Sequence, residues 1–224
     1  MTAVALVVAA GRGRRAGGAL PKQWQSIAGK TVADWTLGRL EESGLFSKLC
    51  IVLHADDMDR SFETTLPLLK VQGGETRDQS VRAGLEALTD FAPDHILIHD
   101  VARPCVPLSV LRSVCASLAT SQGAAPGLEI TDALWRADQG HVVGTMERSG
   151  LVRAQTPQGF DYSAILSAHR SNTATAADDV EIARRVGLSI SIVPGHEDNI
   201  KITKPQDFAR ATAILERQRK EGSL

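Results

Sequence analysis

The sequence is poor in aromatic residues, which make up 4% of its 224 positions. Its core must therefore consist mainly of valine, isoleucine, leucine and alanine. It also lacks a charge excess of either sign, because 25 Lys and Arg stand against 26 Asp and Glu. Proteins that bind nucleic acids or anionic membranes broadly carry a basic excess, so this balance argues against both kinds of partner.

Cysteine is scarce as well. The three cysteines are widely spaced and form neither a CxxC pair nor a spacing typical of metal ligands. Cys50 lies in an apolar, strand-like run, and Cys105 follows Arg103-Pro104 near a possible site, although a packing role suits it better. We expect all three to be reduced thiols, as in a cytosolic protein.

Long apolar runs are missing too, and none reaches the ~18 residues that a membrane crossing needs. The N-terminal apolar run has no basic region before it and no cleavage pattern after it. We therefore expect a cytoplasmic protein without membrane contact. A length of 224 residues, with 43% hydrophobic and 23% charged positions, is typical of one globular domain spanning 1–224.

What the sequence does contain is an alternation of strand-like and helix-like stretches. Apolar runs predict strands at 3–9, 49–53, 95–99 and 189–193, and apolar periodicity predicts helices at 31–42, 59–69, 77–88, 107–118, 162–169, 178–186 and 205–217. This order predicts an α/β fold with a mostly parallel sheet covered by helices on both faces. Pro67 should end or kink its helix, and the charged tail 216–224 should fray.

Segment 128–154 breaks this alternation. It is polar, contains Gly140, Gly144 and Gly150, and alternates apolar with polar residues over 141–146. These features predict a hairpin-like insertion.

The first predicted strand leads into a loop rich in cations: Gly11-Arg12-Gly13-Arg14-Arg15, then Pro21-Lys22-Gln23. Glycines let the backbone approach phosphates, and the cations neutralise their charge. Ligands bind at the carboxyl ends of parallel strands, so the loop predicts a polyphosphate site. It has neither a Walker A lysine nor a full GxGxxG motif, and the alternative is a solvated basic loop.

Four further motifs each have a functional and a structural interpretation. Asp100 follows a predicted strand and can hold Mg²⁺ or a ribose hydroxyl, or cap a turn and pair with Arg103. Gly73-Gly74 allows close backbone approach before a helix that carries Ser80, or forms an ordinary helix start capped by Thr76 or Asp78. Lys201, between two isoleucines, points to a phosphate or to solvent. Asp178-Asp179 can bind metal, but stabilising a helix N-terminus is favoured.

Together the motifs resemble one family, the 2-C-methyl-D-erythritol 4-phosphate cytidylyltransferases, over nearly the whole chain. The resemblance rests on six segments in the family's order: Ala9-Ala10-Gly11-Arg12-Gly13-Arg14-Arg15, Pro21-Lys22-Gln23, Gly73-Gly74 with Arg77 and Ser80, His99-Asp100-Val101-Ala102-Arg103-Pro104, Gln155-Thr156-Pro157-Gln158 and Asp198-Asn199-Ile200-Lys201-Ile202-Thr203.

The resemblance implies a Rossmann-like nucleotidyltransferase fold whose inserted β-arm, about 128–154, clasps a second subunit in a homodimer. It implies transfer of CMP from CTP to 2-C-methyl-D-erythritol 4-phosphate, with release of pyrophosphate and with Mg²⁺ as cofactor. Some members of the family are fused to a cyclase that acts later in the same pathway, so the chain is either a complete enzyme or one part of such a fusion.

The resemblance also implies roles for particular residues. Arg15 and Lys22 stabilise the transition state at the α-phosphate of CTP, and Asp100 lies by the ribose and the metal. Thr156 and Lys201 position the acceptor phosphate, as does Arg148 on the arm of the neighbouring subunit. The nucleotide-binding residues are Ala9, Ala10, Gly11, Gly13, Gly74, Arg77, Ser80, Asp100 and Arg103.

Some positions depart from the family's pattern. Ala133 and Trp135 stand at the start of the arm where threonine and lysine are common, Ala177 replaces a threonine, and Trp24 replaces tyrosine or phenylalanine. A second hypothesis is therefore a cytidylyltransferase for another polyol phosphate, such as ribitol 5-phosphate. A third is a non-catalytic nucleotide-binding protein, against which the set of Arg15, Lys22, Arg148 and Lys201 argues.

Overall fold

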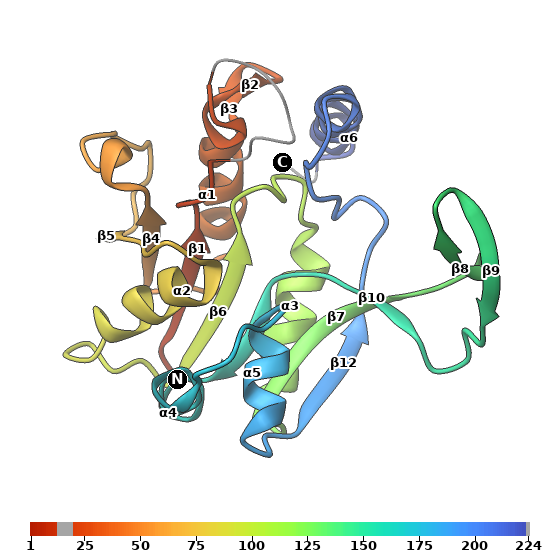
Figure 1. Ribbon diagram of the computed structural model, residues 1–224. Coiled ribbons are helices and arrows are strands. Elements are labelled where there is room, and N and C mark those ends of the chain that lie inside the picture. The colour runs from red at the N-terminus through yellow and green to blue at the C-terminus, as the bar shows by residue number, and fades with distance from the viewer. Residues whose placement is uncertain (13–19, 223–224) are drawn as a thin grey trace.

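The computed structural model describes residues 1–12 and 20–222, and its centre is an eight-stranded sheet (Figure 1). Strands β1 (Ala3–Val8), β4 (Lys48–Leu53), β5 (Leu68–Gln72) and β6 (His95–Asp100) are parallel. The sheet continues with β11 (Gln158–Asp161), β7 (Gly123–Glu129), β10 (Val152–Ala154) and β12 (Ile190–Pro194). Strands β10 and β11 run in the direction opposite to the other six strands of this sheet, so the predicted mostly parallel α/β arrangement is confirmed.

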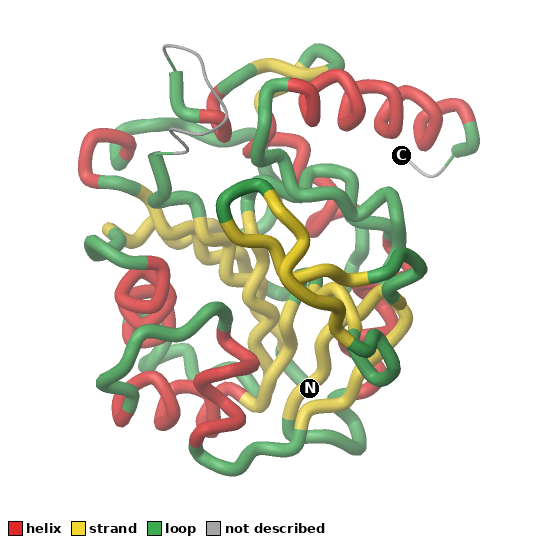
Figure 2. The backbone as a smooth tube through the Cα atoms, turned by 45° about the vertical axis from the view of Figure 1, so that its right-hand side comes forward, coloured by secondary structure: helices red, strands yellow, loops and turns green. Residues whose placement is uncertain are grey.

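Helices cover both faces of this sheet (Figure 2). Because side chains alternate along a strand, Ala5 and Val7 face one layer while Val4 and Leu6 face the other. The first layer contains α1 (Val32–Glu42) and α3 (Leu108–Ser117). The second contains α2 (Arg77–Glu86), α4 (Tyr162–Ser171) and α5 (Asp179–Arg185).

A third apolar cluster lies beyond the carboxyl ends of the central strands. There α6 (Gln206–Lys220) packs on α1 and on the small hairpin of β2 (Ser26–Ile27) and β3 (Lys30–Thr31) through Leu215, Trp35 and Ile27. Two short 3-10 helices, η2 (Lys22–Trp24) and η3 (Ala55–Asp57), complete the elements of the described residues. None of the described helices has the length and apolarity that a membrane crossing requires.

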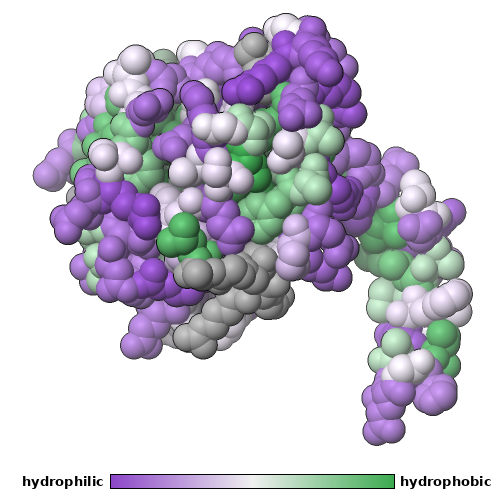
Figure 3. All heavy atoms as spheres, turned by 90° about the horizontal axis from the view of Figure 1, so that it is seen from above, coloured by the Kyte–Doolittle hydropathy of each residue, from purple (hydrophilic) through white to green (hydrophobic). Residues whose placement is uncertain are grey.

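The predicted insertion is a two-stranded arm, β8 (Leu134–Asp138) and β9 (His141–Met146), that projects from the body (Figure 3). Its tight turn uses Gln139 and Gly140, whose φ angles are +46° and +83°. Glycine adopts a positive φ easily, so Gly140 suits its position in this turn. A hairpin is therefore present as predicted, but it spans 134–146, whereas 128–129 and 152–154 belong to β7 and β10 of the central sheet.

Two predicted helical features are wrong. Segment 59–69 is not a helix, because after η3 the chain runs irregularly to Pro67, whose carbonyl accepts from Leu49 N–H and so begins the pairing of β5 with β4. Helix α6 does not fray from residue 216 but continues to Lys220. Gln218 is buried and donates to the Cys105 carbonyl at 3.2 Å, which ties the last turns to the body.

Candidate active site

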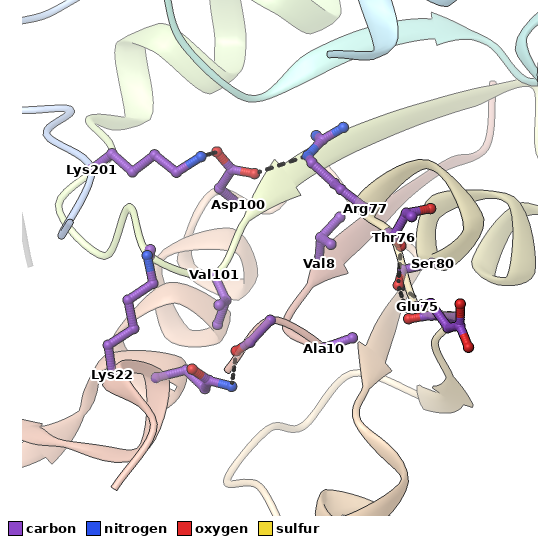
Figure 4. A pocket seen from close by; sticks show the side chains of 14 residues that line it. Val8, Ala10, Lys22, Glu75, Thr76, Arg77, Ser80, Asp100, Val101 and Lys201 are labelled. Atoms are coloured by element: carbon purple, nitrogen blue, oxygen red, sulfur yellow. Dashed lines mark hydrogen bonds and ion pairs between the residues drawn. The ribbon is translucent and has the colours of Figure 1, made fainter. Parts of the chain in front are cut away.

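A cavity of about 210 Å³ opens where three loops leave the carboxyl ends of β1, β5 and β6. Val8 and Asp100 are register partners at the ends of adjacent strands, so the loops after β1 and β6 leave side by side. Helix η2 and the segment around Lys201 close the remaining sides. The lining residues are Val8, Ala10, Gly11, Lys22, Gln23, Gly74, Glu75, Thr76, Arg77, Ser80, Asp100, Val101, Ala102 and Lys201 (Figure 4).

Asp100 is surrounded by cations. Lys201 Nζ lies 2.7 Å from Asp100 Oδ2, Arg77 Nε 3.5 Å from Oδ1 and Arg103 Nε 3.9 Å from Oδ2. Lys201 and Arg77 approach the carboxylate from opposite sides (Figure 4). Burial alone would raise the pKa of Asp100, but the attraction of Lys201 and Arg77 outweighs it and holds the pKa well below its usual range. Asp100 is therefore ionised at neutral pH.

The turn before α2 forms another wall. An added Cβ on Gly73 would lie 2.7 Å from both Ala10 Cβ and Ser80 Oγ, so only glycine fits there. Ser80 Oγ accepts from Gly74 N–H at 3.2 Å and donates to the Thr76 carbonyl at 2.9 Å. The serine predicted to bind the nucleotide thus lines the cavity and also holds the glycine turn against α2, with Thr76 as the helix cap.

Gln23 holds the start of the first loop. Its side chain is fully buried, and Nε2 donates to the carbonyls of Ala9 and Gly11 at 2.9 Å each. Ala9 lies behind the cavity wall, with its N–H bonded to the Val52 carbonyl, whereas Ala10 and Gly11 line the cavity. The predicted residues Gly13 and Arg15 lie outside the described part of the chain.

Two lysines far apart in the sequence meet on one side of the cavity. Lys22 Nζ donates to the Ile202 carbonyl at 2.7 Å, directly beside Lys201. Ile202 N–H in turn donates to the Ala102 carbonyl at 2.8 Å. These bonds fasten the segment that carries Lys201 between η2 and the end of β6.

Thr156 lies behind Asp100 rather than on the cavity wall. Its Oγ1 accepts from Asp100 N–H at 3.1 Å and lies 3.2 Å from His99 Nδ1. His99 Nε2 faces the Arg103 carbonyl at 3.2 Å and must donate to it. Nδ1 of the neutral ring therefore accepts a hydrogen bond from the Thr156 hydroxyl. Burial lowers the pKa of His99 to about 4, consistent with a neutral ring. Here Thr156 supports Asp100; its predicted contact with the acceptor stays a prediction.

Arg103 faces a neighbouring groove of about 320 Å³, which it shares with Arg153, Arg210 and Lys201. Arg103 NH1 donates to the Asn199 carbonyl at 2.6 Å. Asn199 is fully buried and donates to the Thr156 carbonyl at 2.9 Å. The sequence assigned Asn199 no role, because an amide that bonds to backbone groups of distant segments has no signal of its own in the pattern.

The predicted Arg148 is exposed on the loop between β9 and β10 and does not line the cavity of its own chain. Of the acceptor residues predicted from the sequence, only Lys201 lines it.

Within the described residues no group of three His, Cys, Asp or Glu side chains could hold a metal ion. The carboxylates among the described lining residues are Asp100 and Glu75. Magnesium is commonly bound by one or two carboxylates together with substrate phosphates and water. The donor set fits a metal that arrives with a nucleotide and does not fit an all-protein cage.

The site as a whole can bind a polyanion. Lys22, Lys201 and Arg77 line the cavity, and Lys201 and Arg77 partly neutralise the Asp100 carboxylate. The wall on the Arg77 side includes Gly74 and Ser80. Such an arrangement suits phosphoryl or nucleotidyl transfer, in which positioned cations stabilise the charge that builds up on the reacting phosphates.

Comparisons with known proteins identify the family. Residues 3–217 match the family model described as 2-C-methyl-D-erythritol 4-phosphate cytidylyltransferase. The chain is 50% identical over 221 residues to the 2-C-methyl-D-erythritol 4-phosphate cytidylyltransferase of Cereibacter sphaeroides, covering 96% of this chain and 97% of that protein. The crystal structure of 2-C-methyl-D-erythritol 4-phosphate cytidylyltransferase from Thermus thermophilus superposes with a TM-score of 0.79 at 28% identity, covering 94% and 98% of the two chains.

Other relatives are longer. The chain is 53% identical over 221 residues to the "Bifunctional enzyme IspD/IspF" of Rhodobacter capsulatus, a match that covers 98% of this chain. It spans 57% of the length of that relative.

Proposed function

The chain belongs to the 2-C-methyl-D-erythritol 4-phosphate cytidylyltransferase family, and we propose that it transfers CMP from CTP to 2-C-methyl-D-erythritol 4-phosphate. An oxygen of the acceptor phosphate attacks the α-phosphorus of CTP. The bond from the α-phosphorus to the bridging oxygen of the β-phosphate breaks, and pyrophosphate leaves with that oxygen. The products are 4-diphosphocytidyl-2-C-methyl-D-erythritol and pyrophosphate.

One observation carries this proposal: Lys22 and Lys201 lie on one side of the cavity, with the Lys22 ammonium bonded to the Ile202 carbonyl. The reaction brings two polyanions together, so mutual repulsion and misorientation account for much of its barrier. Two cations beside the α-phosphate and the acceptor phosphate reduce both. Lys22, together with Arg15, acts on the α-phosphate, and Lys201 binds the acceptor phosphate.

We assign the nucleotide to the wall formed by Ala10, Gly11, Gly74 and Ser80. Gly73 packs tightly on Ala10 and Ser80, so the loop after β1 and the turn before α2 form one continuous wall against which a nucleotide can lie. Arg77 completes this side of the cavity.

Asp100 would hold Mg²⁺, with the remaining ligands coming from the nucleotide and from water. Its low pKa keeps it ionised, as a magnesium ligand must be. Bound Mg²⁺ would supply charge neutralisation at the phosphates. Thr156 orients Asp100 by accepting its backbone N–H.

The arm is the basis for proposing a homodimer. Trp135, Val142, Val143 and Met146 on β8 and β9 are between 43% and 66% exposed. A lone two-stranded hairpin is marginally stable in water, so this one needs another surface. A second copy of the chain would cover it and bring Arg148 to the acceptor phosphate in the neighbouring cavity.

A second candidate acceptor is another polyol phosphate, such as ribitol 5-phosphate. Trp135, where the family often has lysine, is 66% exposed on the arm that would reach the neighbouring site, and Ala133 precedes it without a hydroxyl. Both changes affect the acceptor side of the site and leave the nucleotide side unaltered.

The test is pyrophosphate release by the purified chain with CTP, Mg²⁺ and each acceptor in turn. We expect release that depends on 2-C-methyl-D-erythritol 4-phosphate. Release with ribitol 5-phosphate alone would transfer the proposal to the second candidate. Tight CTP binding with no release for any acceptor would instead indicate a non-catalytic nucleotide-binding protein.

A further inference from the structure

Two adjacent aspartates open α5, and only the first is needed to cap the helix. Asp178 Oδ1 accepts from Glu181 N–H at 2.9 Å, which is an ordinary N-cap bond. Asp178 Oδ2 accepts from Gln158 Nε2 at 2.8 Å. Helix stabilisation therefore accounts for Asp178 and leaves its neighbour, Asp179, without an explanation.

Asp179 is fully buried between Arg77, a residue of the cavity wall, and His169. Its Oδ2 accepts from Arg77 NH2 at 2.7 Å, and its Oδ1 lies 3.3 Å from His169 Nε2 on α4. A buried carboxylate is costly unless it is paired. Burial disfavours its charge, yet the attraction of Arg77 outweighs burial and lowers the pKa of Asp179, so that it is ionised.

Arg77 joins this buried carboxylate to the cavity. Its NH2 is 2.7 Å from Asp179 Oδ2, whereas its Nε is 3.5 Å from Asp100 Oδ1. The guanidinium is thus held by Asp179 and only loosely engaged by Asp100. The Arg77 side chain is 30% exposed, so without Asp179 it would be able to turn onto Asp100 or into the solvent.

We propose that Asp179 is a positioning residue of the transferase reaction, which holds the Arg77 guanidinium in place at the wall of the nucleotide cavity beside Asp100. The inference rests on the proposed function and adds to it a residue that does not line the cavity. A continuous row of charges, Lys201, Asp100, Arg77 and Asp179, then runs from the cavity into the layer between α2, α4 and α5.

The first test compares Asp179→Asn with Asp178→Ala. Misplacing a group at a reacting centre can reduce the rate on the order of 10²-fold, so we expect Asp179→Asn to lose at least about tenfold in kcat/KM for CTP. Asp178→Ala removes a cap one position away and does not touch Arg77, so its kcat/KM should stay close to that of the wild type. Both are assayed well below their unfolding temperatures, and CTP affinity is measured separately by calorimetry without acceptor.

The second test is a double-mutant cycle with Arg77→Gln. If Asp179 acts through Arg77, Asp179→Asn causes no further loss of kcat/KM in the Arg77→Gln background. The double variant can also be measured if Asp179→Asn alone does not fold, because it removes both charges of the Arg77–Asp179 pair and leaves neither one unpaired in the interior. Losses that multiply independently would overturn the inference, and so would wild-type kcat/KM in Asp179→Asn.

The two proposals fail in different ways. Failure of the proposed function appears as a wild-type protein that releases no pyrophosphate from CTP with the acceptor. Failure of the positioning role appears as an active wild-type protein in which Asp179→Asn and Asp178→Ala behave alike.

Discussion

The cavity at the edge of the sheet and the projecting arm differ in how far their side chains find partners within the same chain. Around the cavity, Asp100 has three cationic neighbours and Lys22 is bonded to the Ile202 carbonyl. On the arm, Trp135 and Val143 are 66% and 63% exposed, although both are large apolar side chains. The charged groups of the cavity are thus paired within one chain, whereas the arm exposes apolar side chains to water.

This difference teaches how the proposed reaction divides between copies of the chain. Of the residues that the sequence assigned to the nucleotide, Ala10, Gly11, Gly74, Arg77, Ser80 and Asp100 line the cavity of one chain. Arg148, expected from the sequence to bind the acceptor phosphate, lies on the arm and away from the cavity of its own chain. On the proposed function, we expect the nucleotide to bind within one chain and the acceptor half of the site to be shared between two copies.

The largest effect should come from the cavity. Replacing Lys22 with alanine removes the ammonium that we propose acts on the α-phosphate, and losing such an electrostatic contact costs ~10²-fold or more in kcat. Lys204→Ala is the matched control, because Lys204 is exposed and does not line the cavity. Steady-state pyrophosphate release measures both. A Lys22→Ala variant with wild-type kcat would refute the assigned role.

The next largest effect should come from the arm and should affect the acceptor only. Arg148→Ala should raise KM for the acceptor by roughly 10- to 100-fold, because a hydrogen bond to a charged group is lost, and should leave CTP affinity unchanged. Arg136→Ala, an exposed position on β8, is the control. Equal losses of CTP and acceptor affinity in Arg148→Ala would remove the distinction between the two regions.

A smaller effect concerns stability near the cavity as the pH falls. Burial lowers the pKa of His99 from 6.5 to about 4. Between pH 6.5 and pH 4, His99 is therefore protonated in the unfolded chain and neutral in the folded chain. The unfolding free energy should therefore fall as the pH drops through this window, by up to about 3 kcal/mol. Urea unfolding from pH 7 to pH 4 measures the slope, and His99→Gln should flatten it. A slope that His99→Gln leaves unchanged would locate the titrating group elsewhere.

The smallest effect is the slow reaction of the thiols. Burial raises the pKa of Cys50 and Cys105 to about 12 and that of Cys115 to about 11, so little thiolate exists at pH 8. A thiol-reactive disulfide should label the native protein slowly and the denatured protein at all three cysteines. Fast labelling of Cys50 in the native state would contradict its burial.

Much of the fold followed from local patterns. Continuous apolar runs predicted β1, β4 and β6 because these strands are buried on both faces, and Thr31 marked the start of α1. Strand β7 had no such pattern, because its sequence is rich in glycine, alanine and proline. Glycine is required at position 123 by close packing, because a Cβ on Gly123 would lie 2.5 Å from Ile190 Cδ1. Small residues that allow close packing have low strand propensity, so the sequence pattern does not predict this strand.

The site was predictable where a motif sits next to a strand end, as for Asp100 and Ala10. The supporting bonds were not, because they join segments far apart in the chain. Gln23 bonds to the loop after β1, Thr156 to Asp100 and Asp179 to Arg77, and the last two pairs are separated by 56 and 102 positions. The 59–69 helix failed for a related reason, since its last residues, Leu68 and Leu69, pair with the distant strand β4 instead.

The most direct measurement of the division between cavity and arm mixes two impaired variants, Lys22→Ala and Arg148→Ala, at an acceptor concentration well below the KM of Arg148→Ala. Each mixed dimer would contain one site with both cations intact, so an equimolar mixture that exchanges subunits should recover about one quarter of wild-type pyrophosphate release. The account predicts this recovery, with almost no release from either variant alone. A mixture that stays as inactive as its components, although subunit exchange is confirmed, would contradict a site completed by the arm of a second copy.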